Sequence, residues 1–124
     1  MRIENGELRI MNHPIQEKSF RFAVRIVNLC KYLQTEQKEY ILSKQLLRSG
    51  TSIGANVSES QQAQSRPDFI SKLNIALKEA SETEYWLRLL FETEYLTKEQ
   101  FDSIFADWDE VKSLLVAIVK SSKN

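Results

Sequence analysis

Apolar residues recur at three- and four-residue spacing in four stretches of the chain, and short polar breaks separate these stretches. This spacing places the apolar side chains of each stretch on one face of an α-helix. The second stretch, for example, directs Leu42, Leu46, Ile53 and Val57 to one side. We therefore expect helices over residues 15–34, 36–64, 67–94 and 98–121.

Helix-start signals support three of these boundaries. Pro14 suits a first helical turn, where its missing N–H costs nothing. Ser65 can cap the third helix, and Thr97 with Gln100 can form a capping box at the fourth. Short breaks make consecutive helices antiparallel neighbours. The predicted fold is all-α, an antiparallel up-down-up-down four-helix bundle over residues 14–122, preceded by an N-terminal arm over residues 1–13.

Composition agrees with long helices in a single domain. The 124 residues include only 3 Gly and 2 Pro, which disfavours an all-β chain with many turns. The 17 basic and 17 acidic residues cancel, whereas a dedicated nucleic-acid binder usually has a basic excess. A single cysteine excludes an intramolecular disulfide, and no apolar run approaches the length of a membrane span. We therefore expect a cytoplasmic protein that does not enter a membrane.

The second expected helix contains Gly50 and Gly54, four residues apart on one face. Glycine lowers helix propensity by up to about 1 kcal/mol relative to alanine. Two explanations are open. The pair can let a neighbouring helix approach closely, or it can mark a local bend near Gly50.

The same helix carries a polar stripe beside its apolar face. Serine and asparagine are poor helix formers, so the stripe costs stability unless its side chains find partners. It can pack against another helix of the bundle through hydrogen bonds, or it can line an interface between subunits. We single out Glu79 and Glu82 of the third helix as candidate partners across the helix pair. The stripe consists of Gln45, Arg48, Ser49, Ser52, Asn56 and Glu59.

Basic residues follow the side of the first helix opposite its apolar face. Lys18, Arg21, Arg25 and Lys31 form a row that could track the phosphates of RNA or DNA. The alternative is an ordinary solvated helix face, which the zero net charge favours.

Paired carboxylates give the best case for an enzyme. Glu79 and Glu82 on the third helix, and Asp107 and Glu110 on the fourth, are each three residues apart and share a face. The two pairs are equally far from the intervening turn. Together they could hold Mg²⁺ for nucleotide hydrolysis, because this cation prefers carboxylate oxygens. The favoured alternative is that they are solvated or salt-bridged residues flanking the core.

Nothing else in the chain suggests catalysis. His13 lies in the arm without a rigid catalytic partner, and Cys30 lies on an apolar face as a small hydrophobe. One Cys and one His cannot close a zinc site, and there is no phosphate-binding glycine loop. We expect no enzymatic activity, no metal and no cofactor.

Four segments resemble a bacterial family of four-helix bundles whose members include proteins encoded in intervening sequences of 23S ribosomal RNA genes. They are QLLRS at 45–49, SIGANVSE at 52–59, IALKEA at 75–80 and ETEYWL at 82–87. The resemblance implies a non-enzymatic bundle that assembles into a ring of five. It also extends to an accessory protein of diversity-generating retroelements, a strongly basic pentamer that binds nucleic acid and a reverse transcriptase.

The sequence therefore predicts a homo-oligomeric accessory module, with weak binding of RNA or DNA through the basic row as its first candidate activity. The alternative is a protein–protein scaffold without nucleic-acid binding, suggested by the zero net charge and by the exposed aromatic candidates Tyr85 and Trp86. Neither reading identifies a protein partner.

Overall fold

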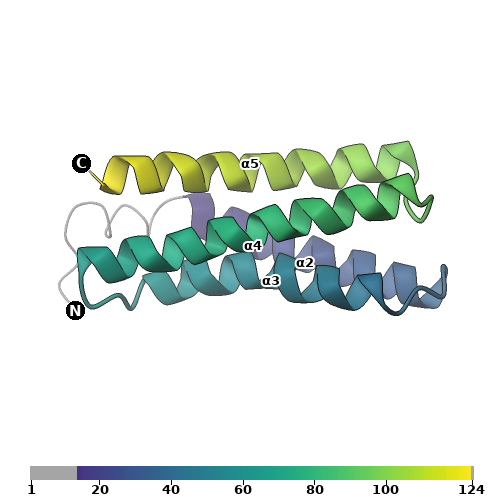
Figure 1. Cartoon of the computed structure of the whole chain (residues 1–124), viewed down its shortest axis with the longest axis horizontal. Coiled ribbons are helices and arrows are strands. Elements are labelled where there is room, and N and C mark those ends of the chain that lie inside the picture. Colours follow the sequence, from purple (N-terminus) through teal and green to yellow (C-terminus); the bar gives the residue numbers. More distant parts are fainter. Residues whose placement is uncertain (1–13, 124) are drawn as a thin grey trace.

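Four helices form the part of the protein that the computed structural model describes, residues 14–123. They run side by side in alternating directions (Figure 1). Each helix packs against the next along the chain, and the fourth packs back against the first. The predicted all-α, up-down-up-down bundle is thus confirmed, whereas the predicted arm and His13 lie outside the described residues. The helices are α2 (Pro14–Thr35), α3 (Leu42–Ser60), α4 (Arg66–Glu92) and α5 (Lys98–Ser122).

The predicted caps of α4 and α5 are present. The Ser65 hydroxyl accepts a hydrogen bond from the backbone N–H of Asp68 at 3.2 Å. The Thr97 hydroxyl accepts one from the N–H of Gln100 at 3.1 Å, and the Gln100 side chain accepts one from the N–H of Thr97 at 2.9 Å. Both helices therefore begin within one residue of the predicted positions, because side-chain caps satisfy their first free N–H groups.

The predicted start of α3 at residue 36 is wrong, because the helix begins at Leu42. Lys38 has a positive φ of 55°, which no helix tolerates. The buried carboxylate of Glu39 then accepts hydrogen bonds from the N–H groups of Ile41 at 3.1 Å, Leu42 at 2.8 Å and Ser43 at 2.7 Å. A glutamate inside the apolar-periodic segment is thus the cap that sets where the helix starts.

The predicted ends of α3 and α4 are also too late. α3 ends at Ser60 instead of residue 64. α4 ends at Glu92, and Glu94 has a φ of 69°. The N–H of Tyr95 donates back to the carbonyl of Leu90 at 2.9 Å, which closes the helix end.

α3 runs without a break through both glycines, so the close-approach explanation is right and the bend is wrong. A Cβ atom added at Gly50 would lie 2.8 Å from Cγ1 of Ile26. One added at Gly54 would lie 3.1 Å from the carbonyl oxygen of Ser19. The glycines therefore let α2 pack directly against the backbone of α3.

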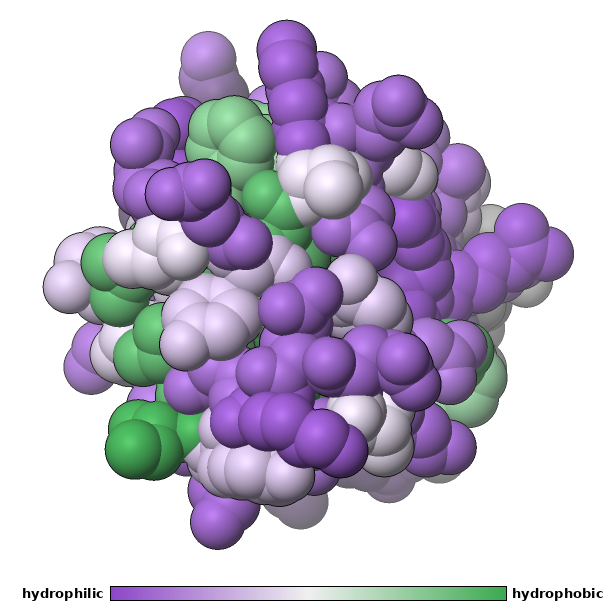
Figure 2. All heavy atoms as spheres, turned by 90° about the vertical axis from the view of Figure 1, so that its right-hand side faces the viewer, coloured by the Kyte–Doolittle hydropathy of each residue, from purple (hydrophilic) through white to green (hydrophobic). Residues whose placement is uncertain are grey.

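The core between the helices is apolar and contributed by all four of them. Figure 2 views the bundle end formed by the two loops 36–41 and 93–97, where hydrophobic side chains gather to one side and hydrophilic ones cover the rest. Tyr40 and Ile41, in the first of these loops, are exposed. The largest fully buried side chains are Phe22, Ile15, Ile26, Leu33, Leu46, Ile53, Leu73, Leu87, Leu90, Leu115 and Val57.

Candidate functional site

The contact between α3 and α4 centres on Arg48, whose guanidinium binds two carboxylates. Its Nη1 lies 3.2 Å from Oε1 of Glu79, and its Nη2 donates to Oε2 of Glu82. The indole N–H of Trp86 donates to the same Glu82 oxygen at 3.0 Å. The hydrogen bond between Arg48 and Glu82 raises the pKa of Arg48, and the same bond, with that of Trp86, lowers the pKa of Glu82. The two glutamates singled out in the sequence thus share one arginine across the helix pair.

A buried pair of hydroxyl groups lies one step deeper between the same helices. Ser49 and Thr83 are both fully buried, and the Thr83 hydroxyl donates to the Ser49 hydroxyl at 3.1 Å. The sequence analysis did not single out Thr83. Thr83 lies three residues after Ala80 and four before Leu87, which are both apolar, and this helical spacing indicates that it faces inward.

The rest of the polar stripe follows the same seam or bonds to its own helix. The Ser52 hydroxyl donates to the carbonyl of Arg48 at 2.6 Å, and the Asn56 amide donates to the carbonyl of Ser52 at 2.8 Å. Glu59 pairs with Lys72 of α4 at 3.2 Å, and Gln45 is exposed. Arg48, Ser49 and Glu59 of the stripe therefore join α3 to α4, whereas Ser52 and Asn56 bond within α3.

Carboxylates of the chain itself neutralise most of the basic row on α2. Lys18 lies 3.0 Å from Oε2 of Glu110 on α5. Arg25 binds Oδ2 of Asp107 at 2.7 Å and also donates to the backbone and side chain of Ser103. Within α2, Arg21 pairs with Glu17 at 2.8 Å, and Lys31 is exposed. The charges of Lys18 and Arg25 are thus already used to hold α2 against α5.

The two carboxylate pairs do not come together. Glu79 and Glu82 form ion pairs with Arg48 on α3. Asp107 and Glu110 instead form ion pairs with α2, through Arg25 and Lys18 respectively. Among the residues that the structure describes, no three His, Cys, Asp or Glu side chains are grouped to hold a metal ion. Each pair therefore flanks a different seam of the bundle and is salt-bridged there, which is the alternative that the sequence favoured over a shared magnesium site.

Cys30 is buried beside the cap of α3. Its thiol donates to the carbonyl of Ser43 at 3.2 Å. Burial and, to a lesser degree, the nearby charge of Glu39 together raise the pKa of this thiol to about 12. A thiol held in its neutral form is a poor nucleophile, so Cys30 acts as a core residue.

The two aromatic candidates on α4 differ in exposure. The Tyr85 side chain is 58% exposed, whereas Trp86 is half-buried against the core. Their rings meet edge to face with centroids 4.9 Å apart. The prediction that Trp86 is exposed is wrong, because its indole N–H is held by Glu82.

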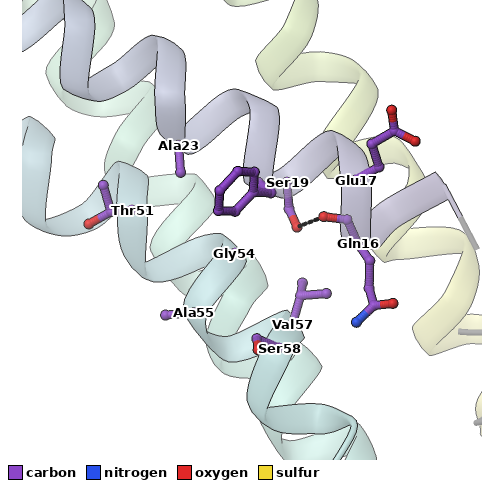
Figure 3. Close-up of a pocket in the computed structure, with 10 residues that line it drawn as sticks. Gln16, Glu17, Ser19, Ala23, Thr51, Gly54, Ala55, Val57 and Ser58 are labelled. Atoms are coloured by element: carbon purple, nitrogen blue, oxygen red, sulfur yellow. Dashed lines mark hydrogen bonds between the residues drawn. The ribbon is translucent and has the colours of Figure 1, made fainter. Parts of the chain in front are cut away.

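A groove of about 580 Å³ follows the outer side of the contact between α2 and α3 (Figure 3). Ser19 and Val57 form its buried floor, and small residues such as Ala23 line its sides. Phe20, which also lines it, is 69% exposed, and Val24 one turn further along α2 is 45% exposed. Sequence analysis missed this surface, although Phe20 and Val24 lie four residues apart and off the main apolar face.

These features define a class: a four-helix bundle whose polar residues mainly bind one another and whose outer surface carries an apolar groove. The chain belongs to the family of 23S rRNA-intervening sequence proteins, whose family model matches residues 11–117. The resemblance to that family is thus confirmed.

A solved structure agrees with this assignment. It is the 1.70 Å crystal structure of a protein of unknown function from the S23 ribosomal protein family of Bacteroides thetaiotaomicron VPI-5482. The two sequences are 65% identical, the match covers 86% of this chain and 95% of that one, and the TM-score is 0.84. A search among curated proteins gives no match. No helix among residues 14–123 has the length and apolarity needed to cross a membrane.

Proposed function

We propose that this chain is a non-catalytic accessory protein of the cytoplasm that works as a homo-oligomer, with the ring of five implied by its family resemblance as the expected assembly. The observation that carries this proposal is the apolar surface of α2 and α3. A phenylalanine that is 69% exposed stands beside a groove of about 580 Å³. Removing such a side chain from water is favourable, so burial of Phe20 would stabilise the binding of another protein surface.

The charged residues support a protein scaffold over a nucleic-acid binder. A cation contributes to phosphate binding when it is free to displace counterions. Lys18 and Arg25 already bind carboxylates of α5, so a phosphate would have to compete with Glu110 and Asp107. The zero net charge of the chain adds no long-range attraction for RNA or DNA.

The proposal of a non-catalytic role rests on the carboxylates. General acid–base or metal-assisted chemistry needs such groups gathered around one reacting position. Here Glu79 and Glu82 are tied to Arg48, away from Asp107 and Glu110. Incubation with a panel of nucleoside triphosphates and Mg²⁺ should leave all of them intact, and hydrolysis above a heat-treated control would overturn this part of the proposal.

Light scattering during size-exclusion chromatography tests the assembly. The expected mass is five times that of the 14.5 kDa chain. A different multiple would keep the self-association and correct the ring size. A mass of one chain at micromolar and higher concentrations would overturn the proposed function.

A fluorescence anisotropy titration with labelled RNA and DNA separates the two candidate roles. We expect no binding at moderate salt. Tight binding that weakens steeply as salt rises, and that is lost when Arg21 and Lys31 are both replaced by glutamate, would favour the nucleic-acid role instead.

A further inference from the structure

A second groove lies on a different side of the bundle, along the first turns of α4. Its volume is about 600 Å³. Ile75 is 39% exposed there. Lys78 of α4 and Lys123, which follows α5, also line it. The remaining lining residues are Pro67, Ile70, Ser71 and Asn74.

The two grooves lie at the same end of the bundle. The α2–α3 groove is lined by early residues of α2 and late residues of α3, and the α4 groove by early residues of α4 and the residue after α5. The starts of α2 and α4 and the ends of α3 and α5 lie together at this end (Figure 1). Two copies placed side by side in the same orientation would therefore present the two surfaces to each other at the same height.

The two surfaces also complement each other in shape and charge. One offers a protruding aromatic side chain, Phe20, and the other an open groove with apolar walls at Ile70 and Ile75. Among the lining residues, the charged group of the α2–α3 groove is the carboxylate of Glu17, and those of the α4 groove are the two lysines. Glu17 pairs with Arg21 of its own helix, but both side chains are exposed, and an exposed ion pair of this kind contributes little, so Glu17 can exchange Arg21 for a lysine of the next copy. Opposite charges at the edge of a contact favour one orientation over others.

We propose that copies of this chain join head to tail, with Phe20 and the α2–α3 groove of one copy packed into the α4 groove of the next. This inference rests on the proposed self-association and specifies the surfaces that carry it. Because the two surfaces differ, each contact leaves one of each kind free for another copy. Such a contact generates a ring when its rotation closes.

Two variants test the pairing. Phe20→Arg places a positive charge against Lys78 and Lys123, and Ile75→Arg fills the groove that receives Phe20. Each single variant should lower the mass measured by light scattering to that of one 14.5 kDa chain. Tyr85→Arg is the matched control, because it adds the same charge at another exposed site on α4 and should keep the mass of the unmutated protein.

Mixing the two variants gives the sharper result. The Phe20→Arg chain retains its α4 groove, and the Ile75→Arg chain retains its Phe20 surface. One intact contact can then form, so an equimolar mixture should contain a complex of twice the chain mass. Circular dichroism before mixing checks that each variant is folded; if either is not, Phe20→Ser and Ile75→Ser replace them.

The outcomes separate the two proposals. If the unmutated protein is oligomeric and either arginine variant keeps the same mass, the head-to-tail pairing is overturned and the proposed function still stands. Folded single variants that give no dimer on mixing would also overturn the pairing. A monomeric unmutated protein would overturn the proposed function itself.

Discussion

The hydroxyl of Thr83 on α4 donates a hydrogen bond to the hydroxyl of Ser49 on α3, 3.1 Å away, and both side chains are fully buried. The Thr83 oxygen also lies 2.8 Å from the carbonyl of Glu79 in the preceding turn. The two hydroxyl groups are hydrogen-bonded to each other, and each also lies near a carbonyl of its own helix, Glu79 for Thr83 and Leu46 for Ser49, so neither is left unpaired. Together with the Arg48 contacts above them, they define the register in which α3 meets α4.

A double-mutant cycle should show this coupling. Thr83→Val and Ser49→Ala each remove one partner of the hydrogen bond, so each should lower the free energy of unfolding by about 1 kcal/mol. The double variant should lose less than the sum of the two, because each single variant already removes the hydrogen bond that the two side chains share. Urea unfolding monitored by circular dichroism measures all three, and strict additivity would show that the hydroxyls do not interact.

Gly50→Ala should destabilise the bundle, although alanine is the better helix former by about 0.8–1.0 kcal/mol. The added Cβ would lie 2.8 and 2.9 Å from the two Cγ atoms of Ile26, which is fully buried. Overpacking of this kind costs about 1–3 kcal/mol, so the net effect should be a loss of up to about 2 kcal/mol. The measurement is again urea unfolding.

Ala117→Gly is the control for that experiment. Ala117 is exposed on α5 and lies outside both proposed contact surfaces, so its replacement by glycine should reveal propensity alone and cost up to about 1 kcal/mol. A Gly50→Ala protein more stable than the unmutated one would mean that α2 and α3 are not held as closely as the structure has them.

Glu39→Gln should destabilise the protein at neutral pH and much less in acid. Burial by itself would raise the pKa of Glu39, but hydrogen bonds from the N–H groups of Leu42, Ser43 and Ile41 and from the Ser43 side chain outweigh it and lower the pKa below 4.5. The folded protein therefore holds the carboxylate as an anion more strongly than the unfolded chain does. The stability that the ionised Glu39 carboxylate gives the folded protein is fully present above pH 4.5 and is lost as the pH falls through the lower pKa of the folded state.

The expected loss for Glu39→Gln at pH 7 is about 1–2 kcal/mol, in the range of helix caps. Urea unfolding at pH 7 and pH 3 should show the difference between variant and unmutated protein shrinking in acid. Glu36→Gln, at an exposed position of the same loop, should change stability little at either pH. A difference for Glu39→Gln that stays constant from pH 7 to pH 3 would contradict the cap.

Cys30 should resist thiol reagents until the protein unfolds. Raising its pKa from 9.0 to about 12 lowers the thiolate fraction at pH 8 by roughly a thousandfold, and burial blocks access as well. Reaction with Ellman's reagent should therefore be slow in buffer and fast in concentrated urea. A rapid, stoichiometric reaction of the native protein would show that the contact between α2 and the start of α3 opens readily.

The sequence was sufficient for the bundle because helices and their caps depend on nearby residues. The spacing of apolar positions places each helix, and Thr97 with Gln100 places the start of α5 within a few residues of itself. The start of α3 was missed because Glu39 acts through its carboxylate on N–H groups that follow it. Nothing in the apolar spacing distinguishes such a cap from an ordinary helical glutamate.

The candidate site was less predictable because it depends on which helix faces match. The positions of Arg48, Glu79 and Glu82 pointed to a shared seam, and these residues do meet. The magnesium alternative failed because equal distance from a turn fixes the height of Asp107 and Glu110, but not the direction in which they point around the helix. The exposure of Phe20 likewise depends on where α3 lies, which the periodicity of α2 alone does not give.

The ion pair between Arg25 and Asp107 joins residues that are 82 positions apart in the chain. A ribosome that adds about 5–20 residues per second makes Asp107 roughly 4–16 s after Arg25. Throughout that interval α2 carries four cations against one carboxylate, with its partners on α5 not yet synthesised. The α2 segment therefore stays cationic in the nascent chain until α5 is made and its Glu110 and Asp107 pair with Lys18 and Arg25.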